Sequence, residues 1–109
     1  MHVVTRERLK LKMFYVKVHR SEGREVLGVC DEDLLGKRFS SGDLEVDVSI
    51  FFFKGELSKK ENVMDLLNNC NNASFVGKNI INLAVEMGVI NKDQVINISD
   101  IPTAMVFSI

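Results

Sequence analysis

Residues 13–30 read MFYVKVHRSEGREVLGVC, and this stretch decides how the fold begins. Apolar and polar side chains alternate over 13–19, which is the period of two that is typical of a half-buried strand. A polar turn follows at 21–23, and a second apolar run occupies 24–30. Two such runs joined by a short loop that contains glycine predict a β-hairpin.

Two later segments have the period of an amphipathic helix. In the first, the apolar residues that share one helical stripe are Val63, Leu66, Leu67 and Cys70. Ser58 and Glu61 have the spacing of a capping box, so we expect this helix over 59–69, ended by the asparagines that follow. We expect a second helix over 77–87, with Gly88 as its C-cap.

Shorter elements fill the rest of the chain. Asp31 to Leu35 has the pattern of one helical turn capped by Asp31, and the alternation over 43–50 predicts a strand with one buried face. A short strand at 95–98 and a buried apolar run at 104–109 complete the pattern. The expected fold class is α+β, a two-layer α/β sandwich. Its short, mostly antiparallel sheet starts with the hairpin and is covered on one face by two helices.

The triplet Phe51-Phe52-Phe53 breaks the alternation of the expected strand before it. Consecutive side chains on a strand point to opposite faces, so three rings cannot share one core. The chain therefore bends here or exposes one ring. Core packing with a bulge is one interpretation, and a surface for a partner or for self-association is the other.

The composition is that of an ordinary globular protein. The chain has 109 residues, of which 46% are hydrophobic and 27% are charged, which suffices for one core. We expect a single domain over 13–109, preceded by residues 1–12 as a basic N-terminal arm that is either flexible or the product of an upstream start codon. No apolar run approaches the roughly 20 residues that cross a bilayer, and no secretory signal is recognisable. We therefore expect a cytoplasmic protein without a membrane partner.

Positive charge is concentrated at the amino end. The net charge is −1, yet residues 1–24 hold seven basic and two acidic side chains, a local charge of +5. Charge asymmetry of this kind can mark a nucleic-acid contact, and an exposed strand face with Tyr15 and Lys17 would offer stacking and charge together. The candidate RNA contacts are Lys12, Tyr15, Lys17 and Arg20. We expect no DNA partner.

Two Gly-Lys pairs indicate a second kind of site. Gly77-Lys78 opens a helix, where free backbone N–H groups and the helix dipole favour anions. The P-loop pattern is not met, since Asn72 and Asn79 stand where it needs glycine and serine or threonine. The candidate binding residues of both pairs and their flanks are Asp31, Gly36, Lys37, Arg38, Gly77 and Lys78.

No catalytic or metal-binding constellation is expected. The acids at 31–33 have no histidine or distant acid as a recognisable partner. A contact between Cys30 and His19 across the hairpin would need an activated thiol, which the neighbouring acids oppose. Cys30 and Cys70 are forty residues apart and are expected to be free, apolar-face thiols without zinc. We expect no metal and no cofactor, and a protein without catalysis is favoured over an enzyme.

Five short strings stand out, namely VCDEDLLGKRF at 29–39, GDL at 42–44, FKGE at 53–56, SFVG at 74–77 and Ile101-Pro102. With these strings the chain resembles, over residues 13 to 109, one archaeal family, the domain of unknown function 424. The resemblance implies a two-layer α/β sandwich in an archaeal cytoplasm and brings no established activity. The chain has Pro-Thr-Ala-Met at 102–105, where the family pattern is Pro-His-Ala-Gln, and Ser74 in place of an asparagine. These departures remove the most polar candidate positions of the family.

The leading functional hypothesis is a noncatalytic accessory or binding module for RNA or the translation apparatus, with RNA or ribosome-associated proteins as partners. The alternative is a small-molecule or anion-binding protein, with catalysis left open, that uses the Asp31–Lys37 turn and the Gly77–Lys78 helix start. That alternative requires the two segments to meet. A third hypothesis is an oligomerisation role built on Phe51 to Phe53.

Overall fold

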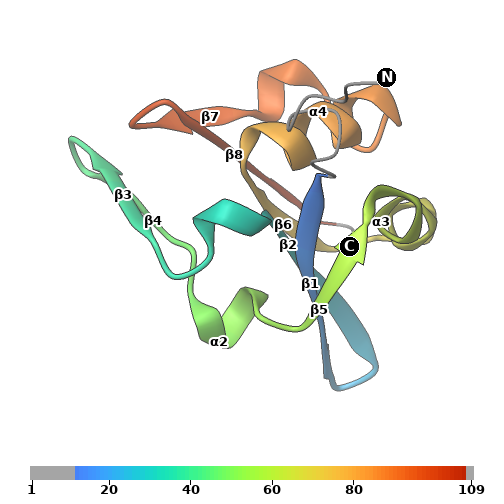
Figure 1. Cartoon of the computed structure of the whole chain (residues 1–109). Coiled ribbons are helices and arrows are strands. Elements are labelled where there is room, and N and C mark those ends of the chain that lie inside the picture. The colour runs from blue at the N-terminus through green and yellow to red at the C-terminus, as the bar shows by residue number, and fades with distance from the viewer. Residues whose placement is uncertain (1–11, 108–109) are drawn as a thin grey trace, which may run out of the picture.

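The computed structural model describes residues 12–107, which form a mixed α+β structure (Figure 1). The strands are β1 (Met13–Ser21), β2 (Arg24–Asp31), β3 (Arg38–Ser41), β4 (Leu44–Asp47), β5 (Glu56–Lys59), β6 (Ala73–Val76), β7 (Ile96–Ile98) and β8 (Ile101–Val106). The helices are α2 (Ile50–Phe53), α3 (Lys60–Asn68) and α4 (Lys78–Glu86), with 3-10 turns η1 (Glu32–Leu34) and η2 (Lys92–Gln94). Six strands form one sheet in the order β5-β1-β2-β6-β8-β7, and β3 and β4 form a separate ribbon.

The predicted hairpin is confirmed. β1 and β2 pair antiparallel from Phe14 opposite Asp31 to Ser21 opposite Arg24, so Glu22 and Gly23 alone form the turn. The other neighbours in the long sheet are also antiparallel, with one exception. β2 and β6 run parallel, with Cys30 opposite Val76, and α3 lies in the connection between them. This parallel pair brings the ends of β2 and β6 to the same edge of the sheet.

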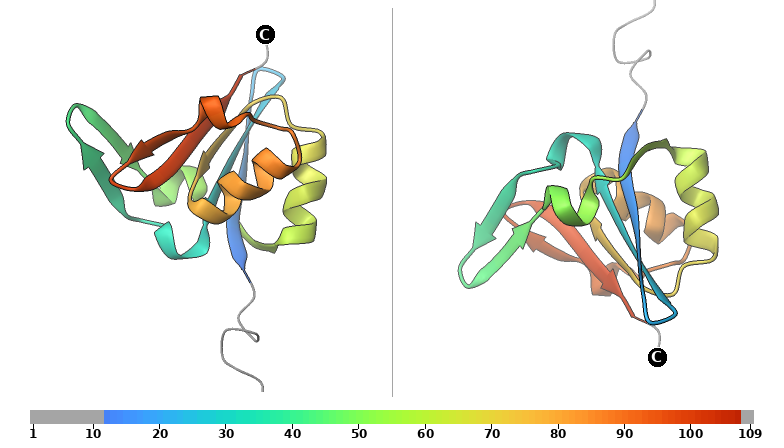
Figure 2. Two further views of the ribbon diagram at one scale, coloured as in Figure 1. Left: turned by 90° about the horizontal axis from the view of Figure 1, so that it is seen from above. Right: turned by 90° about the horizontal axis from the view of Figure 1, so that it is seen from below.

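The long sheet is buried on both faces. On one face α3 and α4 lie side by side over the sheet (Figure 2), and alternate residues of the strands pack against them. The fully buried members of this main core include Val29, Phe75 and Ile80. On the opposite face a smaller core gathers Cys30, Leu34, Val48, Phe53 and Val76. The predicted two-layer arrangement therefore describes only the side that α3 and α4 cover.

The expected strand over 43–50 is wrong in extent. Its first half is β4, which pairs with β3 in the separate ribbon, and Ser49 already caps α2 through a bond from the backbone N–H of Phe52. Leu44 and Ile50 are exposed, whereas Val48 is fully buried in the smaller core. Apolar and polar residues do alternate here. However, the β3–β4 ribbon projects from the long sheet, so it has little surface against which to bury its apolar face (Figure 1).

At the three phenylalanines, both outcomes that the sequence left open occur: the chain bends, and one ring is exposed. The chain bends into the single turn of α2, and Phe51 is 81% exposed whereas Phe53 is 3% exposed. Phe52 is half-buried and stacks on the His19 ring at a centroid distance of 4.5 Å. One ring therefore anchors α2 in the smaller core, and another is left on the surface.

Both long helices were predicted, but the predicted capping box of Ser58 and Glu61 is wrong. α3 spans 60–68 with Lys59 as its N-cap and no side-chain cap, because Ser58 belongs to β5 and its hydroxyl donates to the Glu56 carbonyl. α4 ends at 86, and Gly88 follows with a positive φ, as expected for a C-cap. The short strands β3, β5 and β6 were not expected, because each has only four residues.

The C-terminal part agrees with the prediction only in outline. The strand expected at 95–98 is β7, and the turn before β8 is Ser99-Asp100. Along β8, Ala104 is buried whereas Met105 and Phe107 are exposed, so the last apolar run is not uniformly buried. Residues 108–109 lie outside the described part of the chain, as does the predicted arm except for Lys12. Between 12 and 107 no helix is long and apolar enough to cross a membrane.

Candidate functional site

Asp31 joins the two segments that the anion hypothesis requires to meet. It is the last residue of β2, and its buried carboxylate accepts hydrogen bonds from the backbone N–H groups of Asn79 and Ile80, each at 2.9 Å. The expected capping of its own turn is wrong, because no side-chain bond caps η1. Asp31 instead caps α4, 48 residues further along the chain. A sequence pattern cannot show this contact, which the parallel pairing of β2 with β6 creates.

Gly77 makes room for that carboxylate. It is the residue before α4, with φ +124°, and a Cβ there would lie 2.5 and 2.7 Å from the two oxygens of Asp31. Its N–H donates to the carbonyl of Pro102, so the tip of β6 is also tied to β8. The helix start that was predicted to hold an external anion is therefore already neutralised by an internal one.

Burial controls the two titratable groups at the end of β2. It raises the pKa of Asp31, although the N–H groups of Asn79 and Ile80 oppose the rise. Burial and the neighbouring Asp31 charge raise the pKa of the Cys30 thiol to about 12. Cys30 is 0% exposed and lies opposite Tyr15 across the hairpin, whereas His19 lies opposite Val26. The thiol is therefore far from the activated state that nucleophilic catalysis needs.

The raised pKa of Asp31 gives a pH dependence with a definite sign. Because the folded state holds the proton more tightly than the unfolded state, the contribution of Asp31 to stability should fall as pH rises from the usual aspartate range, near 3.9, through the folded pKa. The variant Asp31→Asn lacks this titration. Urea unfolding of both proteins between pH 3 and pH 7 should show the stability of the wild type, relative to the variant, decreasing with pH. A difference that is constant or grows with pH would contradict this.

The other candidate anion ligands are not gathered around Asp31 by any hydrogen bond between the described residues. The backbone N–H of Gly36 donates to Val48, and that of Lys37 donates to Leu34, which closes the loop after η1. The side chain of Arg38 forms an exposed ion pair with Asp47 of β4, at 3.3 Å. Lys78 is exposed on the first turn of α4.

The four candidate RNA contacts are divided between the two faces of β1. Tyr15 and Lys17 lie on the face of the smaller core, where Tyr15 is half-buried and Lys17 Nζ donates to the Phe51 carbonyl at 2.7 Å. Arg20 points to the opposite side, together with its ion-pair partner Glu25 at 3.0 Å. Lys12 lies with Phe14 on the helix side.

Lys12 lines a small hollow at the beginning of β1. Its volume is about 130 Å³, and Lys60 of α3 and Asn79 of α4 also contribute to it. The opposing acid in its wall is Glu86. We call it the lysine hollow. Neither lysine forms an ion pair within the described chain.

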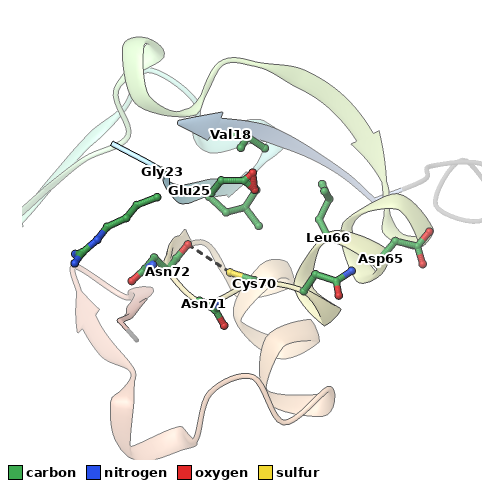
Figure 3. Close-up of a pocket in the computed structure, with 11 residues that line it drawn as sticks. Val18, Gly23, Glu25, Asp65, Leu66, Cys70, Asn71 and Asn72 are labelled. Carbon is green, nitrogen blue, oxygen red and sulfur yellow. Dashed lines mark hydrogen bonds between the residues drawn. The ribbon is translucent and has the colours of Figure 1, made fainter. Parts of the chain in front are cut away.

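A larger pocket of about 530 Å³ lies near the other end of α3 (Figure 3). Val18 and Glu25 reach it from the hairpin, Asp65 and Leu66 from α3, and the loop 69–72 closes it from below. We call it the amide pocket, because three of its four loop residues are asparagines. The sequence argument used these asparagines to end a helix and, for Asn72, to reject a P-loop, and it missed the pocket. The cluster of asparagines around residue 70 is the sequence feature that could have indicated this pocket.

Among residues 12–107, no group of three or more histidine, cysteine or carboxylate side chains is arranged to hold a metal ion. Both cysteines are free thiols, Cys30 buried and Cys70 half-buried. Besides these two hollows and the internal cap, the described part of the chain has a third hollow of about 440 Å³ between α4 and the segment 92–97.

The family comparison bears on all of these features. A family model described as "Protein of unknown function (DUF424)" matches residues 19–109. The chain belongs to this family. The DUF424 match begins within β1 and includes Asp31, the start of α4 and the loop of the amide pocket. Lys12, which lines the lysine hollow, lies outside it.

One solved structure shares this fold. It is the crystal structure of an uncharacterized conserved protein from Methanopyrus kandleri, with a TM-score of 0.69 and 16% sequence identity. The similarity covers 89% of this chain and 95% of that protein. At this identity it establishes the fold of the DUF424 chain and no more. Among curated proteins, none matches the chain.

The segment 102–105, for which the resemblance implies a different family pattern, lies in β8 beside the cap. The carbonyl of Pro102 accepts from Gly77, and the Thr103 hydroxyl donates to the Phe75 carbonyl at 3.0 Å. Thr103 therefore serves the backbone of β6. The polar groups of this part of β8 are used within the sheet and at the start of α4.

Proposed function

We propose that this protein is a noncatalytic accessory or binding module for RNA or the translation apparatus, and that it works in an archaeal cytoplasm. It would contact phosphates through the lysine hollow. The observation that carries the proposal is the convergence of Lys12 and Lys60 in one hollow. Neither lysine forms an ion pair among the described residues, and lysines of this kind can neutralise phosphates.

The charge distribution supports the same surface. Lys12 belongs to the segment 1–24, which has a local charge of +5 in a chain of net charge −1. Two basic side chains, Lys12 just before β1 and Lys60 in the first turn of α3, thus meet in one hollow although they are far apart in the sequence. A backbone-directed contact of this kind needs no base recognition, which fits the absence of RNA-binding sequence motifs in the chain.

The noncatalytic part of the proposal rests on Cys30 and Asp31. These were the two residues with catalytic potential at the end of a strand, and both are buried and used internally. A raised pKa keeps Cys30 as an inert thiol at neutral pH, and Asp31 is held by two backbone donors. Their role in the proposal is structural.

Salt dependence of RNA binding tests the proposal. We expect the double variant Lys12→Glu/Lys60→Glu to bind a single-stranded oligoribonucleotide at least tenfold more weakly than the wild type. The slope of log affinity against log salt should decrease by about 1.4, because each lost phosphate contact in a single strand contributes about 0.7. Fluorescence anisotropy at several salt concentrations measures both quantities.

The matched control is Lys54→Glu/Lys92→Glu, which changes the net charge equally at two exposed lysines outside the lysine hollow. This control should retain the salt slope of the wild type. Equal losses in both double variants would show that only overall charge matters. Wild-type binding that does not depend on salt would contradict the proposal outright.

The second candidate function is binding of a small molecule or anion at the junction of the Asp31–Lys37 turn and the Gly77–Lys78 helix start. It is favoured by the direct contact between these segments through the Asp31 carboxylate. An external anion would have to displace that carboxylate from Asn79 and Ile80. Inorganic phosphate that stabilises Asp31→Asn more than the wild type in thermal unfolding would support this candidate.

A further inference from the structure

The amide pocket has the size and composition of a small-molecule site. Its volume of about 530 Å³ falls within the range of roughly 300 to 1,000 Å³ that is usual for ligand pockets. Val18, Leu27 and Leu66 supply apolar surface, and amide groups come from the loop 69–72. Most of the lining is polar, so a ligand that fits this pocket has polar edges as well as apolar faces, as a heterocycle does.

The loop of the amide pocket is held in place before any ligand arrives. The carbonyl of Asn72 accepts from the N–H of Leu27 at 2.9 Å and from the Cys70 thiol at 3.4 Å (Figure 3). The N–H groups of Asn69 and Cys70 donate to the last turn of α3, each at 3.3 Å. A loop fixed by its own backbone loses little conformational freedom on binding.

The charges of the pocket do not select a phosphate. Arg24 is its one basic residue, and Glu25 and Asp65 are acidic. Glu25 is paired with Arg20, so the acids and the base nearly balance. An uncharged ligand with hydrogen-bonding edges fits such a pocket better than an anion does.

The amide chemistry narrows the class of ligand. A side-chain amide presents an acceptor oxygen next to a donor NH₂ group, which matches an adjacent donor and acceptor on a base edge. Asparagine forms this bidentate pair with N6 and N7 of adenine. The planar guanidinium of Arg24 can lie against a base as well, and in recognition of unstacked bases arginine serves as a stacking surface.

We propose that the amide pocket binds an unstacked adenine-type nucleobase, with Asn69 and Asn71 reading its edge and Val18, Leu66 and Arg24 contacting its faces. The base belongs either to a free nucleoside or to a single-stranded RNA. The inference does not depend on the lysine hollow, since the hollow involves the first turn of α3 and the pocket involves the second half.

Titration of the whole protein with adenosine, and separately with a hexa-adenylate oligoribonucleotide, tests the proposal by calorimetry. We expect Asn69→Ala and Asn71→Ala each to weaken binding on the order of tenfold, in line with the loss of one bidentate base contact. Asn62→Ala is the matched control. It removes an exposed amide from α3 outside the pocket and should bind as the wild type does.

The rate at which Cys70 is alkylated can show where the ligand binds in the wild-type protein. It lines the pocket and is half-buried, whereas Cys30 is fully buried, so alkylation by iodoacetamide at alkaline pH should occur at Cys70 first. Bound adenosine or oligonucleotide should slow that alkylation. Ribose 5-phosphate, which has no base, should not.

The two ligand arms separate this inference from the proposed function. Binding of adenosine that persists in Lys12→Glu/Lys60→Glu supports a pocket for a free nucleoside, even if no RNA binds. Binding of the oligonucleotide alone, weakened by Asn71→Ala, supports a base presented by RNA. If neither ligand binds, or if binding ignores Asn69→Ala and Asn71→Ala, the proposal is overturned.

Discussion

Gly77→Ala is expected to lower the free energy of unfolding by about 4 kcal/mol, near the upper end for a single substitution. The backbone at this position has φ +124°, which side chains other than glycine rarely adopt. A Cβ would also meet both oxygens of Asp31, at 2.5 and 2.7 Å, and would push the carboxylate off Asn79 and Ile80. The substitution thus combines backbone strain with the loss of two hydrogen bonds to a charged group. Urea unfolding at neutral pH measures the effect.

Gly88→Ala is the control for the strain alone. Gly88 also has a positive φ, +74°, but a Cβ there would have nothing within 4 Å. We expect a loss of about 1 kcal/mol, the usual cost of alanine in the left-handed region. If the two substitutions destabilise the protein equally, the contact between Asp31 and α4 contributes nothing, and the account of this cap is wrong.

Gly55→Ala should destabilise the protein by about 3 kcal/mol or more, for a reason of space rather than conformation. A Cβ at this position would overlap the carbonyl oxygen of Val16 and lie 3.0 Å from Cα of Lys17. These are backbone atoms of β1, so no side-chain rotation relieves the contact. Because Val16 pairs with Glu56 at the start of β5, the edge strand should separate from the sheet there. Hydrogen exchange at the β1–β5 pair locates the change.

The comparison for Gly55→Ala is Glu56→Ala, one residue along the chain, where the side chain is exposed. This variant should stay within about 0.5 kcal/mol of the wild type, as surface substitutions usually do. Fast exchange throughout the protein, rather than at β5 and its neighbours, would mean that the edge strand does not open on its own.

The elements with a strong local period were predictable. β1, α3 and α4 each place apolar residues at the period of their own secondary structure, and each buries that face. β2 was recognisable as a short apolar run, and its second half is buried on both faces of the sheet. The four-residue strands were not predictable in the same way, because four residues hold too few repeats to distinguish a period. The alternation over 43–50 led to the wrong prediction of one continuous strand, because its first half belongs to the projecting ribbon and the chain then turns into α2.

The residues of the candidate sites could be found more easily than their partners. Asp31, Gly77 and Lys12 stand out in the sequence as an acid after a strand, a glycine before a helix and a cation at the amino end. That Asp31 reaches α4, and that Lys12 meets Lys60, depends on which strands are neighbours. The amide pocket was missed because its walls come from a hairpin, a helix and a loop that no spacing rule connects.

The sequence by itself determined the mixed α+β class, the first hairpin, the two long helices and the free cysteines, because each depends on local periodicity or on composition. Only the tertiary structure decided what Asp31 caps, which face each basic residue occupies and where the pockets lie. The parallel pairing of β2 with β6 is the physical reason for the first of these. It aligns the end of β2 with the start of α4, 48 residues apart between Asp31 and Asn79, and no local pattern in the chain encodes that alignment.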